Sequence, residues 1–379
     1  MPLFLISAIL SGKHLDTDSR TTTVMISKPG ENFAFSSSLS ADVWHPQKGD
    51  KSYEWWYFDA LSDDGREAIV IVFLDNFIYS PRYNRETISI TGNERCPAVS
   101  FTYFKDGKAV CRATTEFHHS EFTASEVNPE CSIGDSGFTF RSASYGSGFL
   151  VKVVASLPGA RQVEAELEWL SVESDLAPRE FSYEEQRHCW NMVSPRSDVS
   201  GKITVKDSSG TETESLHFRG TGYHDHNLDN RWLAKTVRDW HWGRAHYADC
   251  TVVFYRFRET RAETADTSLI LIRNGNMERM SAKFEEQSYV RDKFGIRYPS
   301  HLELVTENNI RVHVKPIDVI DSSFYFLRFA SELTLSIPGR EDRKTTGITE
   351  FIAPKILKYR WLNWLSDVRT GKNGESSFF

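Results

Sequence analysis

Residues 54–74 read EWWYFDALSDDGREAIVIVFL. Aromatic and β-branched residues, which favour extended backbone, fill Trp55 to Ala60 and again Ala68 to Leu74. Between the two runs lies Ser62-Asp63-Asp64-Gly65, which is a turn signal because Asp and Gly tolerate the backbone angles of tight hairpins. The stretch therefore predicts an antiparallel β-hairpin.

The same pattern recurs along the rest of the chain. Short β-favouring runs bounded by turn residues lie at 99–104, 138–141, 149–155, 163–169, 201–205, 250–257, 268–272, 310–314, 324–329 and 332–337. Each half holds about eight such runs, which is enough to close a small barrel. We expect an all-β fold of two antiparallel barrels in tandem, residues 1–190 and 191–379, with the join near 175–196 and a short C-terminal helix over 355–365.

Composition narrows the class of partner. The 379 residues are 40% apolar and 26% charged, with a net charge of -7 and no lysine or arginine run. This balance indicates a globular chain with a sizeable core and disfavours binding to nucleic acid or stable insertion into a membrane. Five scattered cysteines without a CxxC pair, and an apolar start without a basic n-region, predict reduced thiols and a cytoplasmic location. The sequence does not indicate an oligomeric state.

Histidine and tryptophan are concentrated in one window. Five of the twelve histidines and three of the ten tryptophans lie within residues 217–246, which include GYHDHN at 222–227 and DWHWGRAH at 239–246. If 223–227 is extended, Tyr223, Asp225 and Asn227 share one face, and His224 and His226 share the other. We expect proton transfer on the first face and a supporting or metal-binding role on the second.

Asp225 is the first candidate for a catalytic acid. A carboxyl group among aromatic side chains in a dry lumen has a raised pKa and can stay protonated near neutral pH. Tyr223 would then hydrogen-bond this carboxyl or the substrate, and Asn227 would hold a polar group. The alternative is that Asp225 has only a structural hydrogen-bonding role.

The histidines allow two interpretations. His224 and His226 could supply two zinc ligands, with His241 or His246 as the third. No carboxylate or thiol completes a recognised spacing, so we expect no metal. The other interpretation is that these rings support the site through bonds to backbone carbonyl groups.

The aromatic stretch at 54–59 contains a second acidic candidate. Glu54 and Trp56 share a face, so Glu54 is either a second acid or a hydrogen-bond acceptor for buried indole groups. Arg244 is a candidate for substrate binding or for a buried ion pair with Asp225 or Asp239. No GxGxxG, GxxxxGK or GxSxG motif follows a strand, which disfavours a nucleotide cofactor and serine hydrolase chemistry.

Taken together, EWWYFD at 54–59, WNMVSPRSDVSG at 190–201, GTGYHDHN at 220–227 and WGRA at 242–245 resemble the CrtC/AttH-like family of hydroxyneurosporene synthases (carotenoid 1,2-hydratases) and fungal decalin-forming Diels–Alderases. The resemblance covers about residues 52–365. It implies two lipocalin-like barrels, a pocket at or near their junction and action on long apolar olefins without a cofactor. By motif it assigns protonation of an alkene to Asp225 with Tyr223, and anchoring of a polar substrate head to Glu54.

We therefore expect a cofactor-independent enzyme that hydrates, cyclises or isomerises a hydrophobic isoprenoid-like or polyketide olefin by acid catalysis. A pericyclase that folds a polyene for cycloaddition, in which Glu54 would matter more than Asp225, is the first alternative. A non-catalytic carrier of an apolar ligand is the second. The expected catalytic residues are Asp225, Tyr223 and Glu54. The expected substrate-binding residues are Trp56, Asn227, Trp240, His241, Trp242 and Arg244, with His224 and His226 in support.

Overall fold

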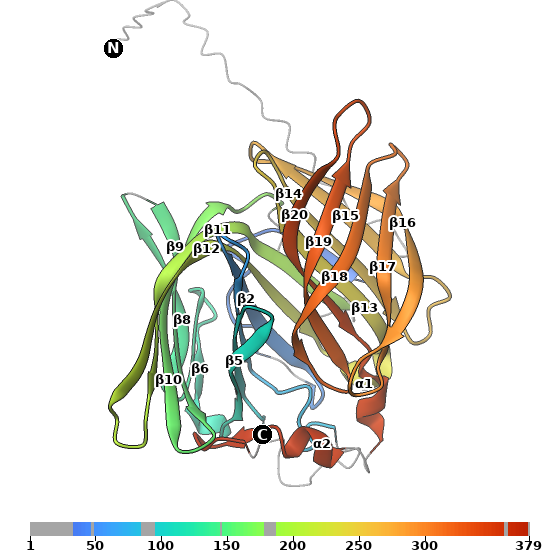
Figure 1. Cartoon of the computed structure of the whole chain (residues 1–379). Coiled ribbons are helices and arrows are strands. Elements are labelled where there is room, and N and C mark those ends of the chain that lie inside the picture. Colours follow the sequence, from blue (N-terminus) through green and yellow to red (C-terminus); the bar gives the residue numbers. More distant parts are fainter. Residues whose placement is uncertain are drawn as a thin grey trace, which may run out of the picture.

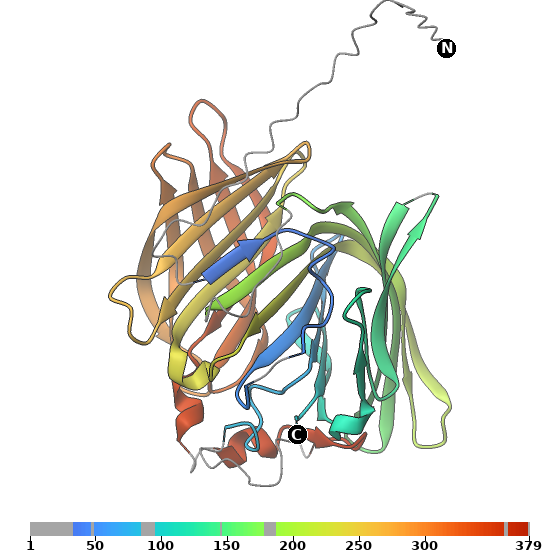
Figure 2. The same ribbon diagram turned by 180° about the vertical axis from the view of Figure 1, so that it is seen from behind.

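The structure, a computed structural model, describes residues 33–46, 49–84, 95–144, 146–177, 187–359 and 363–377. Two β units lie side by side (Figure 1), and Figure 2 shows them from behind. The first is an open, curved sheet of β1 (Phe33–Ser36), β2 (Tyr53–Ser62), β3 (Glu67–Leu74), β4 (Ala98–Lys105), β5 (Lys108–Glu116), β6 (Phe122–Ala124), β7 (Glu130–Ile133), β8 (Ser136–Ala143), β9 (Gly146–Leu157), β10 (Arg161–Glu173), β11 (His188–Lys206), β12 (Glu212–Asp229) and β21 (Gly371–Lys372).

The second unit is a closed barrel. It consists of β13 (Val237–His246), β14 (Thr251–Glu259), β15 (Asp266–Arg273), β16 (Asn276–Arg291), β17 (Arg297–Thr306), β18 (Arg311–Ser322), β19 (Phe326–Ser336) and β20 (Arg343–Ile352), with β20 paired back to β13. The described helical segments are short: the α-helices α1 (Leu233–Thr236) and α2 (Asn363–Asp367) and the 3-10 helices η1 (His119–Glu121) and η3 (Pro354–Lys358).

The predicted hairpin at 54–74 is confirmed as β2 and β3. At its turn, Gly65 has a φ of 71°, a left-handed conformation that glycine adopts without steric cost. The Asp64 carboxylate accepts a hydrogen bond from the Arg66 N–H at 3.0 Å and one from the Ser62 hydroxyl at 2.6 Å. These contacts provide the turn chemistry that the Asp-Gly pair predicted.

The strand order brings distant segments together. The first sheet runs β21-β5-β4-β3-β2-β12-β11-β10-β9-β8-β7-β6, so β12 lies next to β2. In this antiparallel pair Asp225 lies opposite Tyr57, and His226 lies opposite Trp56. The two aromatic stretches that stand out in the sequence are therefore hydrogen-bonded neighbours.

Three large apolar cores stabilise the described part of the chain. One fills the concave side of the first sheet and includes Trp56, Phe58 and Trp169. A second lies inside the barrel, and a third fills the space between the two units, with Tyr57 contributed by the sheet and Trp242 by the barrel. Each unit is thus apolar on its inside and also on the side that faces its neighbour.

The all-β prediction is confirmed, and two details differ from it. Only the second unit closes; the first sheet remains a half-barrel whose end strands, β6 and β21, are very short. The chain leaves the sheet after Asp229 and enters the barrel at Val237, so residue 190, where the N-terminal domain was expected to end, lies inside β11. The boundary lies later because β11 pairs with β12, and β12 pairs with β2. Both β11 and β12 therefore belong to the first sheet, although β2 is far away in sequence.

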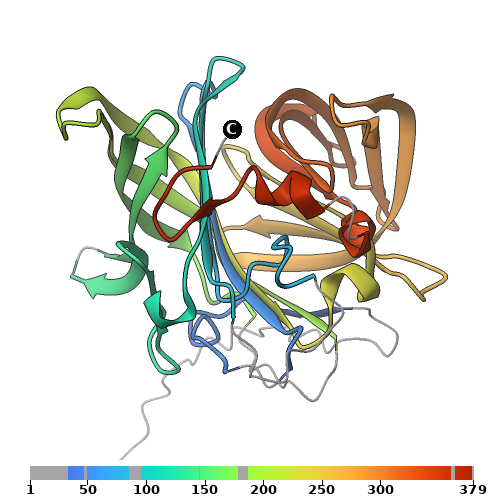
Figure 3. The same cartoon turned by 90° about the horizontal axis from the view of Figure 1, so that it is seen from below.

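The C-terminal segment links the two units. After the barrel, η3 and α2 lead to β21, which pairs with the edge strand β5 of the first sheet. Figure 3 shows this red segment passing beneath the space between sheet and barrel. The expected helix at 355–365 is present as these two short pieces, while residues 360–362 lie outside the described part. No helix within the described ranges is long and apolar enough to cross a membrane.

A buried ion pair joins the barrel to the sheet. Arg244 of β13 donates from Nε to Oδ1 of Asp59 on β2 at 2.8 Å, and its terminal nitrogen Nη2 contacts the same oxygen. Both side chains are buried, with exposed fractions of 1% and 0%. Arg244 was expected to bind substrate or to pair with Asp225 or Asp239; its partner is Asp59.

We expect the substitution Arg244→Met to lower the free energy of unfolding by about 3–5 kcal/mol, because it leaves the Asp59 carboxylate buried without its cation. The matched control is Lys202→Met, whose exposed pair with Glu212 should contribute less than about 1 kcal/mol. Urea denaturation followed by tryptophan fluorescence measures both variants. Equal losses in the two variants would contradict the structural role of the buried pair.

Candidate active site

A pocket lies between the sheet and the barrel. Strands β2, β3, β4, β5 and β12 form one wall, and the outward faces of β13, β14, β18, β19 and β20 form the other. The volume of the pocket is about 960 Å³, which includes the solvent-filled space at its opening. Its position between the two units agrees with the expectation of a pocket at their junction.

Strand alternation divides the predicted site residues between two faces of the first sheet. On β12, Asp225 and Asn227 line the pocket, and on β2, Trp55 and Tyr57 do so. The residues between them point to the concave side of the sheet, because successive side chains of a strand face opposite ways. Four predicted residues, namely Glu54, Trp56, His224 and His226, therefore lie on the opposite side of the sheet from Asp225.

Asp225 is a buried carboxyl group held by three donors. The Tyr223 hydroxyl donates to Oδ2 at 2.8 Å, the Trp190 indole N–H donates to Oδ2 at 3.0 Å, and the Asn227 amide donates to Oδ1 at 2.8 Å. Only 5% of the residue is exposed. Burial raises the pKa of Asp225 to about 7, with a smaller contribution from the negative charge of Glu350, while the bonds from Tyr223 and Trp190 oppose the shift.

The donor arrangement indicates which oxygen carries the acidic proton. Oδ2 already accepts two hydrogen bonds, whereas Oδ1 accepts only the one from Asn227. A carboxyl oxygen has two lone-pair sites, so the free site is on Oδ1. The protonated form of Asp225 therefore bears its hydrogen on Oδ1, the oxygen not used by Tyr223 and Trp190.

A buried histidine supports Asn227 from behind. His188 Nε2 lies 3.2 Å from Oδ1 of Asn227, and its Nδ1 lies 3.3 Å from the Tyr53 hydroxyl. Burial lowers the pKa of His188 to about 3, so the ring is neutral. Because the Asn227 amide group donates to Asp225, its oxygen must accept from His188. This arrangement assigns the hydrogen of His188 to Nε2, which also lies 3.0 Å from the Tyr255 hydroxyl.

Aromatic rings surround the acid. The Trp242 ring lies 5.4 Å from Tyr57 and 4.9 Å from Tyr223, measured between centroids. Trp240 stacks near Trp55 at 6.3 Å. Of these rings, Trp55, Tyr57, Trp240 and Trp242 line the pocket, as the prediction for Trp240 and Trp242 required. The acid thus faces a largely apolar space.

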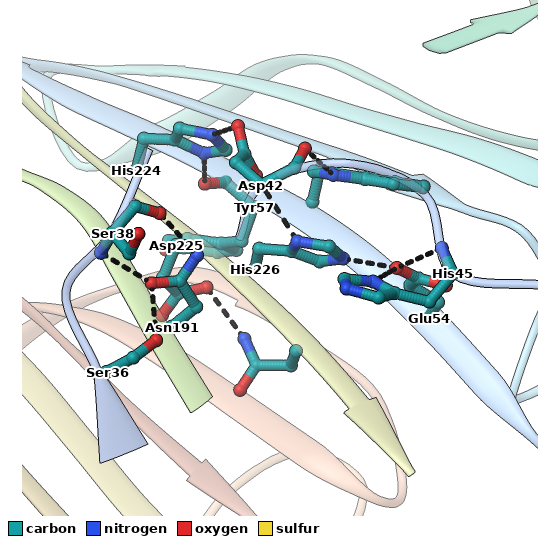
Figure 4. Close-up of polar contacts among 12 residues, drawn as sticks. Ser36, Ser38, Asp42, His45, Glu54, Tyr57, Asn191, His224, Asp225 and His226 are labelled. Atoms are coloured by element: carbon teal, nitrogen blue, oxygen red, sulfur yellow. Dashed lines mark hydrogen bonds and ion pairs between the residues drawn. The ribbon is translucent and has the colours of Figure 1, made fainter. Parts of the chain in front are cut away.

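The concave side of the sheet carries a separate network (Figure 4). His226 Nε2 lies 2.7 Å from Oε1 of Glu54, and its Nδ1 lies 3.3 Å from Oδ1 of Asp42. Asp42 also contacts His224 at 3.0 Å, and Glu54 contacts His45 Nδ1 at 2.9 Å. The network holds the loop that contains Asp42 and His45 against β2 and β12.

This network is charged. Burial opposes the charge on His226, but the close carboxylates of Asp42 and Glu54 outweigh it and raise the pKa of His226 to about 9. Burial also opposes ionisation of Glu54, yet the bonds from His226 and His45 lower its pKa. Glu54 is therefore an ionised partner of His226 and has no proton to donate at neutral pH.

His45, Glu54 and His226 could supply metal ligands, since their ligand atoms lie within 4.8 Å of one another. Two of these separations, 2.7 and 2.9 Å, are hydrogen-bond distances that a shared proton explains. A metal would also require a neutral His226. The zinc set considered from the sequence does not assemble, because His241 Nε2 lies 3.0 Å from Glu286 and His246 Nε2 lies 2.9 Å from the Pro195 carbonyl oxygen.

His241 lies apart from the pocket. Its ring packs between Phe284 and Phe351, at centroid distances of 5.0 and 4.6 Å. It alternates along β13 with Trp240 and Trp242, which face the pocket, so it points into the barrel. The predicted set thus divides into a group on the pocket side, namely Tyr223, Asp225, Asn227, Trp240 and Trp242, and residues that lie elsewhere.

Sequence reasoning missed three parts of the site. His188 and Trp190 begin β11 and reach the acid because β11 pairs with β12. Tyr255 of β14 stacks on Trp190 at 4.6 Å and hydrogen-bonds His188 at 3.0 Å. The motif at 190–201 was a signal for Trp190, whereas no local pattern marked Tyr255.

Comparisons with known proteins agree with this geometry. Residues 71–378 match the model of the carotenoid hydratase CrtC family. The chain belongs to this family. It is 25% identical to a hydroxyneurosporene dehydrogenase of Chlorobaculum tepidum, with 88% of this chain and 91% of that protein covered. It is 24% identical to an acyclic carotenoid 1,2-hydratase of Thiocapsa roseopersicina over 60% of this chain, which spans about half (52%) of that relative.

Solved structures share the fold of this CrtC family member. The putative AttH of Nitrosomonas europaea superposes with a TM-score of 0.59 at 13% identity, covering 86% of this chain and 98% of that one. CghA in complex with Sch210972 gives a TM-score of 0.54 at 14% identity, covering 86% and 97%. The family description and the Thiocapsa roseopersicina relative both name hydratases, which supports an enzymatic role for this chain.

We expect Asp225→Asn to change the pH dependence of stability. Between about pH 4 and pH 7 the folded wild type keeps a proton on Asp225 that the unfolded chain releases, so its stability falls as the pH rises. The Asp225→Asn variant lacks this loss, and its stability relative to wild type should increase by up to about 4 kcal/mol over that range, at 1.36 kcal/mol per pKa unit.

Urea denaturation at a series of pH values measures this difference, and Asp63→Asn at an exposed turn controls for the change in net charge. A new contact between the introduced amide and the side chain of Asn227 would add an offset that does not vary with pH. A difference that stays constant from pH 4 to pH 7 would mean that Asp225 is ionised in the folded chain.

Proposed function

We propose that this protein hydrates or cyclises an olefin in the pocket between sheet and barrel, with Asp225 as the proton donor. The observation that carries the proposal is the buried Asp225 carboxyl, which has a free lone-pair site on Oδ1 and lines an aromatic pocket. A carboxylic acid with a pKa near the working pH is well suited to general acid catalysis. Membership of the carotenoid hydratase family supports an alkene as the group that reacts.

The proposed step begins with transfer of the Oδ1 proton to the less substituted carbon of the alkene. The π electrons form the new C–H bond, and a tertiary carbocation remains at the other carbon. Water or a second alkene of the substrate then attacks the cation. In hydration, the added water releases a proton to the Asp225 carboxylate, so the net change is the addition of one water molecule. In cyclisation, attack by the second alkene moves the positive charge to a new carbon, and loss of a proton from the adjacent carbon to the Asp225 carboxylate forms a new alkene, so the net change is an isomerisation. Both routes regenerate the acid.

Two features of the site would lower the barrier. The faces of Trp55, Tyr57 and Trp242 border the pocket, and each could stabilise positive charge by about 0.5–2 kcal/mol. The two donors on Oδ2, Tyr223 and Trp190, would stabilise the Asp225 carboxylate that forms when the proton leaves. Tyr223 therefore serves as a positioning residue that also balances the charge of the acid.

We expect Asp225→Asn to lower kcat/KM by about 10²–10⁴-fold, the usual contribution of a general acid. In wild type, kcat/KM should be constant below about pH 7 and should fall above it, because only the protonated carboxyl donates. Turnover of an acyclic carotenoid such as lycopene, and of shorter linear isoprenoid olefins, is followed by mass spectrometry. Glu54→Gln is the matched control, because Glu54 lies on the other face of the sheet.

Incorporation of deuterium from the solvent distinguishes acid catalysis from a pericyclic mechanism. In D₂O, acid catalysis places one deuterium on carbon in the product, whereas a pericyclase forms its product without incorporating solvent hydrogen. Full activity of Asp225→Asn, or product without carbon-bound deuterium, would refute the assignment of Asp225. A ligand that is bound and released unchanged would indicate a carrier.

A further inference from the structure

The pocket has a second, charged end. On the sheet wall, register partners Asp225, Tyr57, Val72, Ser100 and Thr114 form one row across β12, β2, β3, β4 and β5, and all five line the pocket. Neighbouring strands lie about 4.8 Å apart, so Thr114 is roughly 19 Å from Asp225. The pocket is therefore an elongated slot with the acid near one end.

The barrel wall contains a matching row. Tyr255, Trp242, Glu350, Arg328 and Asp321 are register partners across β14, β13, β20, β19 and β18, and they too line the pocket. The row changes from aromatic to charged side chains along its length. The two walls meet at the far end through the ion pair between Arg112 of β5 and Asp321, at 3.0 Å.

Three arginines line the slot. Arg328 lies over the Tyr57 ring, 5.3 Å from its centroid, whereas Arg112 and Arg369 contact Asp321 and Ser322 at the charged end. Arg112 pairs with Asp321, and Arg328 pairs with Glu350 at 2.7 Å. Arg369 donates to the Ser322 carbonyl oxygen at 3.0 Å and lies near the Phe294 ring, and no carboxylate among the described residues pairs with it. When Asp225 is protonated, the lining of the slot therefore carries three positive charges, on the arginines, and two negative charges, on Asp321 and Glu350.

Arg328 also has an unused donor. The residue is 7% exposed, and its buried Nε–H has no hydrogen-bond acceptor in the part of the chain that the structure describes. A buried donor without an acceptor is costly, and a ligand oxygen would relieve that cost. A purely hydrocarbon ligand would leave both the Arg328 Nε–H and the Arg369 charge unpaired.

We propose that the substrate is an amphipathic olefin with a carboxylate at the end remote from the reacting double bond. Its carboxylate binds Arg369 at the charged end, and its alkene reaches Asp225 at the aromatic end; the spare Nε–H of Arg328 lies in the same slot and can donate to a ligand oxygen. This inference rests on the proposed function for the position of the reacting alkene, and on the charges of the slot for the head group. An arginine matches a carboxylate well because its planar fork presents parallel N–H donors.

Paired ligands test this proposal. Geranylgeranoic acid and geranylgeraniol share one linear isoprenoid chain and differ in the head group, and isothermal titration calorimetry measures the affinity of each for the full chain. Wild type should bind the ionised acid at least about tenfold more tightly than the alcohol. Arg369→Gln should abolish this preference while it keeps the affinity for the alcohol, and Arg369→Lys should retain part of it.

Arg340→Gln is the matched control, because Arg340 is half exposed on the barrel and pairs with Asp249 outside the slot. It should keep the full preference for the acid. Equal affinity for both ligands in wild type, no binding of either, or an unchanged preference in Arg369→Gln would overturn the proposal. Asp225→Asn separates the two proposals: it should lower kcat/KM by about 10²–10⁴-fold and keep the preference for the acid, so each can fail without the other.

Discussion

The antiparallel pairing of β2 with β12 determines the chemistry of both faces of the first sheet. Asp225 and Tyr57 lie opposite each other on the pocket side, and His226 and Trp56 do so on the concave side. A shift of β12 by one residue against β2 would exchange the two faces of β12. It would turn His226 toward the pocket and bury the acid among Phe58 and Trp169. Function therefore depends on a pairing between segments that are far apart in sequence.

Buried ionisable groups are stabilised differently on the two faces of the first sheet. On the concave side, a cationic His226 lies between the carboxylates of Asp42 and Glu54, so opposite charges compensate one another. On the pocket side, Asp225 has only neutral donors, and burial raises the pKa of its carboxyl to about 7, so that a large share of it is protonated near neutral pH. A cation beside Asp225 would lower its pKa and remove the proton. The ionised network can thus hold β12 in place without lowering the pKa of Asp225, because its charges lie on the opposite side of the sheet.

The sequence predicted the fold class, and the placement of Tyr223, Asp225 and Asn227 on one face of a strand, for identifiable reasons. Alternation within a strand is local, so the division of Tyr223 and Asp225 from His224 and His226 could be derived from 222–227 alone. Whether Glu54 lies on the same side of the sheet as Asp225 could not be derived in this way, because it depends on the register between β2 and β12. Trp190, His188 and Tyr255 approach the acid only through strand pairing and domain packing. The arginines of the slot lie on β5, β19 and the C-terminal segment and show no common motif.

The proposed chemistry depends on the raised pKa of one buried carboxyl group, that of Asp225. Carbon-13 NMR of protein labelled at the aspartate side-chain carboxyl carbon, with Asp225→Asn to assign the resonance, reports the ionisation of this group directly. We expect the Asp225 signal to titrate with a midpoint near pH 7. A midpoint near pH 4, the ordinary value for an aspartate, would show that the group is a carboxylate at neutral pH and would rule out Asp225 as the proton donor.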